Sequence, residues 1–256
     1  MRDLRLALQI DAPLEISVVK QRLGQRAVLR VRSVEEDPPA VWFVKLQRRR
    51  VQPDRIAQLR SIAEIGERAE VRIPRPVALL PRYRATILTP VSGDRILSGA
   101  EPPRVLQEVG EAIARLHRLL PALGPLRREG FEGSRVDRSG SLIDALRPDL
   151  RDRFDAAAAR WWANRPRGPR SNDAVLSLHG DFYPAQVLVA EETATGRGRV
   201  GLLDWDEVCR GDPERDIGNF DAHLILEEVR TKSVDQRTAP VDAASLEPLA
   251  AEGAEG

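Results

Sequence analysis

The stretch at residues 177–189 reads SLHGDFYPAQVLV, and residues 200–208 then read VGLLDWDEV. Each contains a short apolar run, typical of a buried β-strand, with acidic residues beside it. Asp181 and Gln186 lie between the apolar runs SL and VLV, and Asp204 directly follows VGLL. Two short strands around a tight loop can bring these three side chains together, so they form one candidate site.

Two carboxylates and a carboxamide at one place suit phosphoryl transfer from a nucleotide. That reaction needs a carboxylate to orient the attacking hydroxyl and oxygen ligands to hold magnesium against the phosphates. Asp181 would supply the first and Asp204 the second, since hard cations prefer oxygen ligands. The tripeptide HGD alone is more typical of an ordinary turn, but here Gln186, Asp204 and a GDP tripeptide at 211–213 follow in order. The ordered set favours catalysis over a turn.

The segments HGDFYPAQVL (179–188) and LLDWDEVCRGDPERDIGNF (202–220) resemble the aminoglycoside phosphotransferase family. The resemblance is strong over about residues 105–225 and weaker over 15–93. It implies an α+β, protein-kinase-like fold with a small N-terminal antiparallel β lobe carrying one helix and a mainly helical C-terminal lobe. It also implies transfer of the γ-phosphate of ATP or GTP to a hydroxyl of a small molecule, with Mg²⁺ as the metal cofactor.

The resemblance also implies a role for each residue of the loop region. Asp181 stands at the position of the catalytic aspartate, and Asp204 at that of the metal-binding aspartate. Gln186 stands at the second metal position, where Asn is usual, and its extra methylene shifts the carboxamide, which catalytic geometry tolerates poorly. His179 and Asp216 are implied to support the loop through hydrogen bonds. The departure at Gln186 keeps a non-catalytic, nucleotide-binding pseudoenzyme as the alternative function.

Two other acidic residues allow more than one interpretation. Asp206 follows Asp204 by two positions, so it could back up a metal site; bonding to nearby loop amides is the interpretation that we favour. Asp212 precedes Pro213 and could be simply a helix cap.

Lys45 is the candidate phosphate contact in the first third of the chain. It ends the apolar segment WFVK and is one of only three lysines. The kinase lysine that grips the α- and β-phosphates has this setting, and a surface lysine at a strand end is the alternative. Asp54 and Glu64 are candidates for its carboxylate partner on the following helix, with neither in convincing register.

Gly24, Thr89 and Val91 complete the expected nucleotide site. The segment KQRLGQRAVLRV (20–31) has a single glycine, Gly24, which could bring backbone near the phosphates or form an ordinary hairpin turn. The segment TPVSG (89–93) falls where the family has its hinge between lobes, so the backbone of Thr89 and Val91 would hydrogen-bond the adenine.

Composition excludes several other classes of protein. With 40 basic and 39 acidic residues among 256, the net charge of +1 gives no global attraction to nucleic acid or anionic membranes. The single cysteine, Cys209, excludes an intrachain disulfide and a cysteine-cluster metal site. No apolar run approaches the roughly 20 residues of a membrane span, and Asp3 and Asp11 make the N-terminus a poor signal peptide. We expect a cytoplasmic protein with a small-molecule acceptor and no nucleic-acid or membrane partner; monomer and dimer both stay open.

The order of elements predicts two lobes and a tail. Residues 1–91 would form the nucleotide-binding lobe, residues 92–230 the catalytic lobe, and residues 231–256, rich in Ala, Glu, Asp and Gly, a disordered tail. Strands are predicted at 15–20, 27–34, 40–46, 77–80 and 85–89, and helices at 53–66, 105–119 and 142–162.

The C-terminal region is shorter than the family pattern, in which several helices follow the segment that corresponds to GDPERDIGNF. An open acceptor site and a truncated homologue are the two explanations. A missing helical layer would expose apolar surface on the predicted 105–119 helix.

Overall fold

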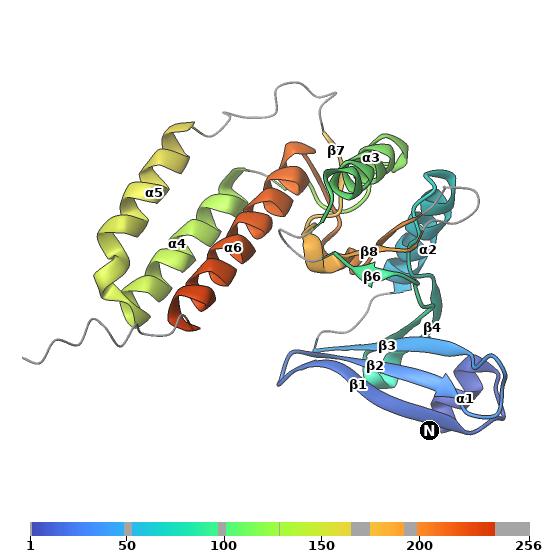
Figure 1. The fold of residues 1–256 in the computed structure, drawn as a ribbon. Coiled ribbons are helices and arrows are strands. Elements are labelled where there is room, and N and C mark those ends of the chain that lie inside the picture. The colour runs from blue at the N-terminus through green and yellow to red at the C-terminus, as the bar shows by residue number, and fades with distance from the viewer. Residues whose placement is uncertain are drawn as a thin grey trace, which may run out of the picture.

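The chain folds into an N-terminal antiparallel sheet and a larger, mainly helical part, as the sequence predicts (Figure 1). The computed structural model describes residues 2–48, 53–96, 101–127, 129–164, 175–191 and 199–238. The sheet has the strand order β1-β2-β3-β5-β4, and all neighbouring strands are antiparallel. Its strands are β1 (Leu14–Arg22), β2 (Arg26–Ser33), β3 (Val41–Gln47), β4 (Pro76–Leu80) and β5 (Ala85–Leu88).

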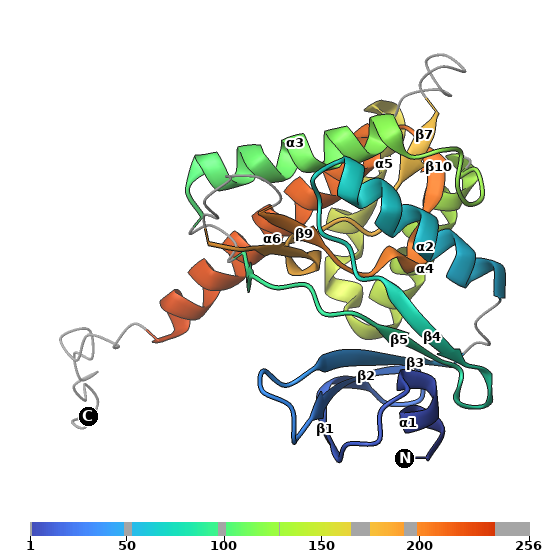
Figure 2. The ribbon, with the colours of Figure 1, turned by 90° about the vertical axis from the view of Figure 1, so that its right-hand side faces the viewer.

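Alternation along the strands gives this sheet two different faces. Val31 of β2 and Val44 of β3 point to an apolar face, where they pack with Leu4 of α1 (Arg2–Leu8). Lys45 follows Val44 and therefore points to the opposite face, which is turned toward the helical part of the molecule (Figure 2). The sequence analysis did not predict α1; the helix covers the outer face of the sheet.

The larger part is built from helices around two small sheets. Its helices are α2 (Pro53–Arg68), α3 (Pro103–Leu119), α4 (Glu129–Leu146), α5 (Arg151–Asn164) and α6 (Glu214–Thr238). Its strands are β6 (Asp94–Arg95), β8 (Val187–Val189) and β9 (Val200–Leu202) in one sheet and β7 (Leu176–Leu178) and β10 (Cys209–Gly211) in the other. Ile62 of α2, Ile113 of α3 and Leu202 of β9 are fully buried in a common core. Helix α2 thus follows the first sheet in sequence but packs into the second core.

The helical region predicted at 142–162 is two helices. The short 3₁₀ turn η2 (Pro148–Leu150) separates α4 from α5, because proline lacks a backbone N–H and disfavours helix in the residue before it. Helix α4 starts at Glu129, and the glycines Gly133 and Gly140 lower its helix propensity, which hides it in the sequence.

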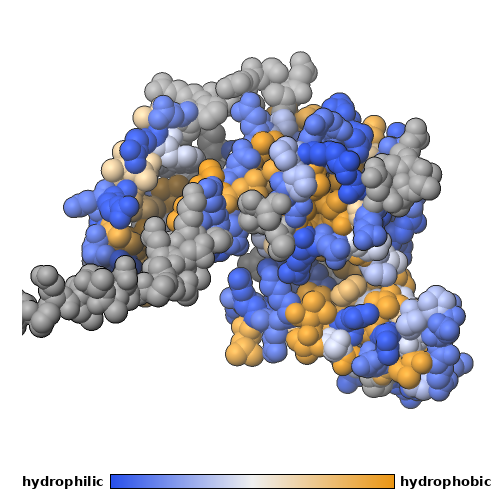
Figure 3. Space-filling view, in the orientation of Figure 1, coloured by the Kyte–Doolittle hydropathy of each residue, from blue (hydrophilic) through white to orange (hydrophobic). Residues whose placement is uncertain are grey.

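The C-terminal region differs from its prediction in two ways. Helix α6 continues to Thr238, past residue 231 where a disordered tail was predicted to begin, and residues 239–256 lie outside the described residues. The apolar stripe of α3 is buried, so the exposure that a missing helical layer would cause on the 105–119 helix is not found there. Large apolar side chains are instead exposed on α4, α5 and α6 (Figure 3); they include Leu142, Leu146, Trp161, Ile225 and Val229.

Among the helices of the described residues, none combines the length and the apolar character needed to span a bilayer.

Candidate active site

A glycine shapes the loop between β7 and β8 that carries the HGD tripeptide. Gly180 has a φ of +83°, and a Cβ atom added there would lie 2.0 Å from the carbonyl oxygen of Glu207. Only glycine fits this conformation and this close approach. The carbonyl oxygen of Gly180 accepts a hydrogen bond from Nη1 of Arg127 at 2.9 Å. The loop with Asp181 therefore lies against the segment that follows Asp204.

Asp216, at the start of α6, holds this loop in position through hydrogen bonds. Its carboxylate accepts hydrogen bonds from the backbone N–H of His179 (2.8 Å) and of Gly180 (2.9 Å), and from Nε2 of His117 on α3 (2.9 Å). Burial on its own raises the pKa of Asp216, but the hydrogen bonds from His117 and Gly180 outweigh it and hold the pKa below its ordinary value. An ionised carboxylate thus satisfies two backbone donors of the loop that carries the HGD tripeptide.

His179 is fully buried and is bonded to the backbone on both sides. Its Nε2 lies 2.8 Å from the carbonyl oxygen of Leu203, to which it donates, and its Nδ1 accepts the N–H of Asp181 at 3.4 Å. Burial lowers the pKa of His179, so the ring is neutral. With both nitrogens engaged, His179 orients the loop and is poorly placed to act as a base.

Asp181 is half-buried, and its carboxylate is not one of the groups that form the hydrogen bonds of Asp216 and His179 described above. Burial raises the pKa of Asp181, and the negative charge of Asp204 raises it further, against the opposing effect of His179. A carboxylate with a raised pKa is better suited to accept a proton from a hydroxyl than an exposed one.

Asp204 gathers three side chains that are far apart in sequence. It adopts the left-handed conformation (φ 58°, ψ 61°) directly after β9. Its Oδ1 lies 2.5 Å from Nζ of Lys45, and its Oδ2 lies 3.4 Å from Nη1 of Arg26 and 3.5 Å from Nε2 of Gln186. Although burial raises the pKa of Asp204, the ammonium group of Lys45 lowers it more, so the carboxylate is ionised at neutral pH. Of the predicted residues, Lys45, Gln186 and Asp204 therefore meet at one point.

The carboxylate partners of Lys45 lie in the segment after β9 and not on α2. Its Nζ also lies 2.5 Å from Oδ2 of Asp206, which accepts a second hydrogen bond from Nε2 of Gln47 at 2.7 Å. Among the ion pairs of the described residues, neither Asp54 nor Glu64 contacts Lys45. The favoured interpretation of Asp206 as a carboxylate that bonds loop amides was wrong, because its partners are the side chains of Lys45 and Gln47 of β3 and of Arg55.

The residues predicted for the rest of the nucleotide site lie in separate places. Gly24 forms the turn between β1 and β2 with a φ of +69°, and a Cβ atom there would meet nothing within 4 Å, so its conformation and not its size requires glycine. Thr89 donates its backbone N–H to the carbonyl oxygen of Arg75 at 2.9 Å, so this N–H is already occupied. Val91 lies over Gly201 of β9, where a Cβ would come within 2.5 Å of its Cγ1.

The side chains at Asp204 fit a magnesium ion bound together with a nucleotide. Magnesium is commonly held by one or two protein oxygens, phosphate oxygens and water. Asp204 offers a carboxylate oxygen, and the amide of Gln186 offers its oxygen when turned so that Oε1 replaces Nε2. Among the described residues, no group of three or more His, Cys, Asp or Glu side chains is placed to hold a metal ion without such help.

Three residues of the site were missed or misread in the sequence. Arg26 reaches Asp204 from the strand after the Gly24 turn. Arg55 of α2 donates to the carbonyl oxygen of Trp205 and lies 3.9 Å from Oδ1 of Asp206. The spacing of Asp206 two positions after Asp204 was a usable signal for a shared side-chain partner; the two arginines had none, because the chain holds so many.

Comparisons with known proteins bear on the family and the fold of the chain. A family model described as "Phosphotransferase enzyme family" matches residues 19–232. The GDP complex of aminoglycoside 2'-phosphotransferase-IIIa is 15% identical, with a TM-score of 0.56 over 94% of this chain and 83% of that chain. Choline kinase LicA from Streptococcus pneumoniae is 12% identical, with a TM-score of 0.57 over 94% and 80%. The gentamicin complex of APH(2")-IIa is 15% identical, with a TM-score of 0.54 over 84% and 71%.

At such identities these structures show the fold, and they confirm the prediction of a protein-kinase-like, two-lobed architecture. No curated protein matches the chain by sequence.

Proposed function

The chain belongs to the phosphotransferase enzyme family, and we propose that it transfers the γ-phosphate of ATP or GTP to a hydroxyl group of a small molecule. The observation that carries this proposal is the meeting of Lys45, from the N-terminal sheet, with Asp204 and Gln186, from the helical part. A cation and two oxygen-bearing side chains at the junction of two lobes form a suitable binding site for nucleotide phosphates and their metal.

In this proposal each side chain has one task. Asp181 orients the acceptor hydroxyl and takes its proton, for which its raised pKa is favourable. Lys45 moves from the carboxylates to the α- and β-phosphates. Magnesium, when bound by Asp204 and Gln186, neutralises charge on the phosphate oxygens. His179 and Asp216 keep the loop in position through the hydrogen bonds described above.

The nucleotide base is assigned to the segment between the lobes. Because the N–H of Thr89 is bonded to Arg75, we assign the adenine contact to the carbonyl of Thr89 and the backbone of Val91. Gly24 would place the turn between β1 and β2 over the phosphates. Residues 1–91 would then form the nucleotide-binding lobe and residues 92–230 the catalytic lobe.

The test is nucleoside diphosphate release from Mg·ATP and Mg·GTP in the presence of a panel of hydroxyl acceptors. The panel begins with gentamicin and choline, because structural neighbours are a gentamicin complex and a choline kinase. Asp181→Asn is expected to reduce acceptor-dependent turnover by roughly 10²–10⁴-fold while nucleotide binding is kept. Turnover of Asp181→Asn at the wild-type rate would refute the assignment, and nucleotide binding without transfer would favour the pseudoenzyme.

A further inference from the structure

Arg26, the first residue of β2, contacts the same carboxylate as Lys45. Its Nη1 lies 3.4 Å from Oδ2 of Asp204, the oxygen that Nε2 of Gln186 also approaches, at 3.5 Å. Lys45 contacts the other oxygen, Oδ1, at 2.5 Å. Arg26 is therefore the cation at the oxygen of Asp204 that lies beside the second proposed metal ligand.

The backbone of Arg26 is fixed by hydrogen-bonded strands on both sides. In register, Arg26 pairs with Arg22 of β1 and with Gln47 of β3. The turn before it is closed by the N–H of Gln25, which donates to the carbonyl oxygen of Arg22 at 3.0 Å. The N–H of Arg48 donates to the carbonyl oxygen of Gln25 at 2.9 Å, which joins the end of β3 to the same turn. A change of partner by Arg26 therefore needs a movement of its side chain alone.

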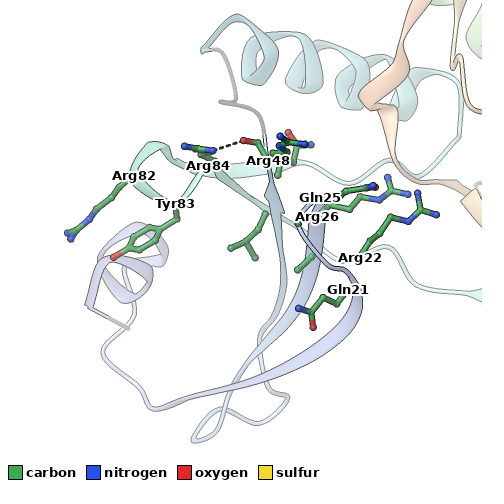
Figure 4. A pocket seen from close by; sticks show the side chains of 12 residues that line it. Gln21, Arg22, Gln25, Arg26, Arg48, Arg82, Tyr83 and Arg84 are labelled. Carbon is green, nitrogen blue, oxygen red and sulfur yellow. Dashed lines mark hydrogen bonds between the residues drawn. The ribbon is translucent and has the colours of Figure 1, made fainter.

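The charges around Arg26 favour an additional anion. Arg22 lies directly opposite Arg26 across β1 and β2, and like charges in this position repel each other. Figure 4 shows the two side chains extending to the same side of the hairpin. Among the ion pairs of the described residues, Arg26 has Asp204 as its one carboxylate partner and Arg22 has none. Because Asp204 is also shared with Lys45, an anion bound beside Arg26 would relieve the repulsion between the two arginines.

Arg26 also lies near the loop that carries Asp181. Burial raises the pKa of Tyr183, two residues after Asp181, and the negative charge of Asp181 adds to the rise. The guanidinium group of Arg26 opposes both effects on the pKa of Tyr183. On its other side, Arg26 lines a hollow of about 460 Å³ together with Gly24. Arg26 is thus close to the turn assigned to the phosphates and to the loop assigned to the acceptor hydroxyl.

We propose that Arg26 exchanges one anion for another when nucleotide binds: it pairs with Asp204 in the free protein and with the β- and γ-phosphates in the complex. An oxygen of Asp204 that is taken by a metal ion is no longer available to a guanidinium group. Lys45 has Asp206 as a second carboxylate partner, whereas Arg26 has no other in the described part of the chain.

Phosphate oxygens are the anion that remains for Arg26 in the proposed complex, and a guanidinium group binds them through two parallel hydrogen bonds. The inference rests on the proposed nucleotide site and adds a side-chain contact to the phosphates where the turn offers a single glycine, Gly24.

Calorimetric titration of the full chain with Mg·ATP and with AMP tests the phosphate contact. In Arg26→Gln the Kd for Mg·ATP is expected to rise about ten- to a hundredfold, the range for a lost hydrogen bond to a charged group. The Kd for AMP should stay at the wild-type level, because AMP lacks the phosphates that Arg26 would contact. The matched control, Arg32→Gln, lies on the same face of β2 and removes an ion pair of 3.2 Å to Glu15; it should bind both nucleotides as the wild type does.

Metal binding without nucleotide tests the exchange itself. The probe is Mn²⁺, whose free concentration is followed by electron paramagnetic resonance. Because Arg26 competes with a metal ion for Asp204, Arg26→Gln is expected to bind Mn²⁺ about two- to fivefold more tightly than the wild type and than Arg32→Gln. This change is opposite in sign to the change for Mg·ATP, whereas a merely structural role of Arg26 would weaken both or neither.

Equal affinities of the wild type and Arg26→Gln for Mg·ATP, or for Mn²⁺ alone, would overturn the proposal. An equal loss of AMP and Mg·ATP binding would also overturn it, since that loss would reflect damage to the turn. If the wild type itself binds no Mg·ATP, the proposed nucleotide site fails and this inference fails with it.

Cooperative melting without ligand checks that Arg26→Gln folds. If it does not, Arg26→Lys takes its place, because lysine keeps the charge and loses the two parallel hydrogen bonds. A smaller loss of Mg·ATP affinity is then expected, and wild-type affinity in Arg26→Lys would likewise overturn the proposal.

Discussion

Lys45 stands between two carboxylates, with its Nζ 2.5 Å from an oxygen of Asp204 and 2.5 Å from an oxygen of Asp206. One ammonium group therefore serves two negative charges, and Arg26 and Arg55 approach the same two carboxylates at 3.4 and 3.9 Å. In the proposed complex a magnesium ion would compete with these cations for the oxygens of Asp204. Asp206 matters in this arrangement because it shares Lys45 and so leaves Asp204 available to a metal.

Replacing Asp206 tests this sharing. In Asp206→Asn the ammonium group of Lys45 is expected to pair with Asp204 alone and to compete with magnesium for it. The apparent Kd for Mg·ATP should rise by about three- to tenfold, the range that a lost charge interaction at a partly exposed site allows. Asp212→Asn, in the same acidic segment, is the control and should bind as the wild type. Equal affinities for the wild type and Asp206→Asn would contradict the role given to Asp206.

The ionised carboxylate of Asp181 should lower the free energy of unfolding. Because burial raises the pKa of Asp181 in the folded state, the folded protein binds a proton there more tightly than the unfolded chain, and stability falls as the pH rises through that window. Asp181→Asn should therefore raise the free energy of unfolding at pH 7, with no such gain below the ordinary aspartate pKa of 3.8. Urea denaturation of the wild type and of Asp181→Asn, at pH 7 and below pH 3.8, measures these free energies of unfolding. A less stable Asp181→Asn protein at pH 7 would contradict this expectation.

At this scale the sequence predicted the residues near the motif better than their distant partners. Asp204 and Gln186 lie 18 positions apart within one recognisable pattern. Lys45 and Asp204 are 159 positions apart, and Arg26 and Asp204 are 178 apart. Which of the many arginines and acids meet across such distances depends on how the two lobes pack, and no local pattern encodes that.

At the scale of elements, the loop between β7 and β8 that carries the HGD tripeptide depends on two helices, α3 and α6. Helix α6 supplies Asp216, whose carboxylate accepts the N–H groups of His179 and Gly180, and α3 supplies His117 to the same carboxylate. The bonds from His179 and His117 are buried and the one from Gly180 is partly buried, so water cannot fully replace this carboxylate as their acceptor.

Truncating this carboxylate should be far more damaging than removing a helix cap nearby. Asp216→Ala is expected to cost about 3–5 kcal/mol, because three donors lose a charged acceptor at about 1–3 kcal/mol each. Asp212→Ala removes the hydrogen bond that Oδ1 accepts from the N–H of Glu214 at 3.0 Å and should cost only about 1 kcal/mol. Urea denaturation of both variants measures the difference. Equal costs would show that the loop is held by other contacts.

The same carboxylate should make stability depend on acid. Because hydrogen bonding keeps the pKa of Asp216 below its ordinary value, its contribution is complete above pH 3.8 and is lost as the pH falls through the folded pKa. The free energy of unfolding of the wild type should therefore fall over this acid range more steeply than that of Asp216→Asn. Parallel pH profiles for the two proteins would contradict this.

Element prediction succeeded where periodicity was clear. The strands of the first sheet and α3 follow regular apolar spacing, and the structure confirms them. The sequence predicted only part of α4. Its glycines lower the helix propensity, and its packing partner, α5, lies later in the chain. The short α1 depends on the apolar face of the sheet for its stability, as helices of this length do.

At the scale of the whole molecule, two apolar cores meet at a cluster of charges. One core lies between α1 and the first sheet, and the other lies among α2, α3 and the small sheets. The side chains of Lys45, Arg26 and Gln47 reach across from the first sheet to the segment after β9. The resemblance of residues 105–225 to a family made this two-lobed plan predictable, and the packing of α2 into the second core was not.

A nucleotide bound between the two lobes would contact both and so stabilise the folded chain. The most direct test is therefore a thermal melt of the wild type and Asp204→Asn, each alone, with magnesium, with ATP and with both. At a ligand concentration of about 100 times the Kd, binding adds about 2.7 kcal/mol, or roughly 5–10 °C for a chain of this size. We predict such a rise for the wild type only when magnesium and ATP are both present, and its loss in Asp204→Asn. A clean melt that Mg·ATP leaves unchanged in the wild type, or an equal rise in the variant, would contradict the nucleotide site.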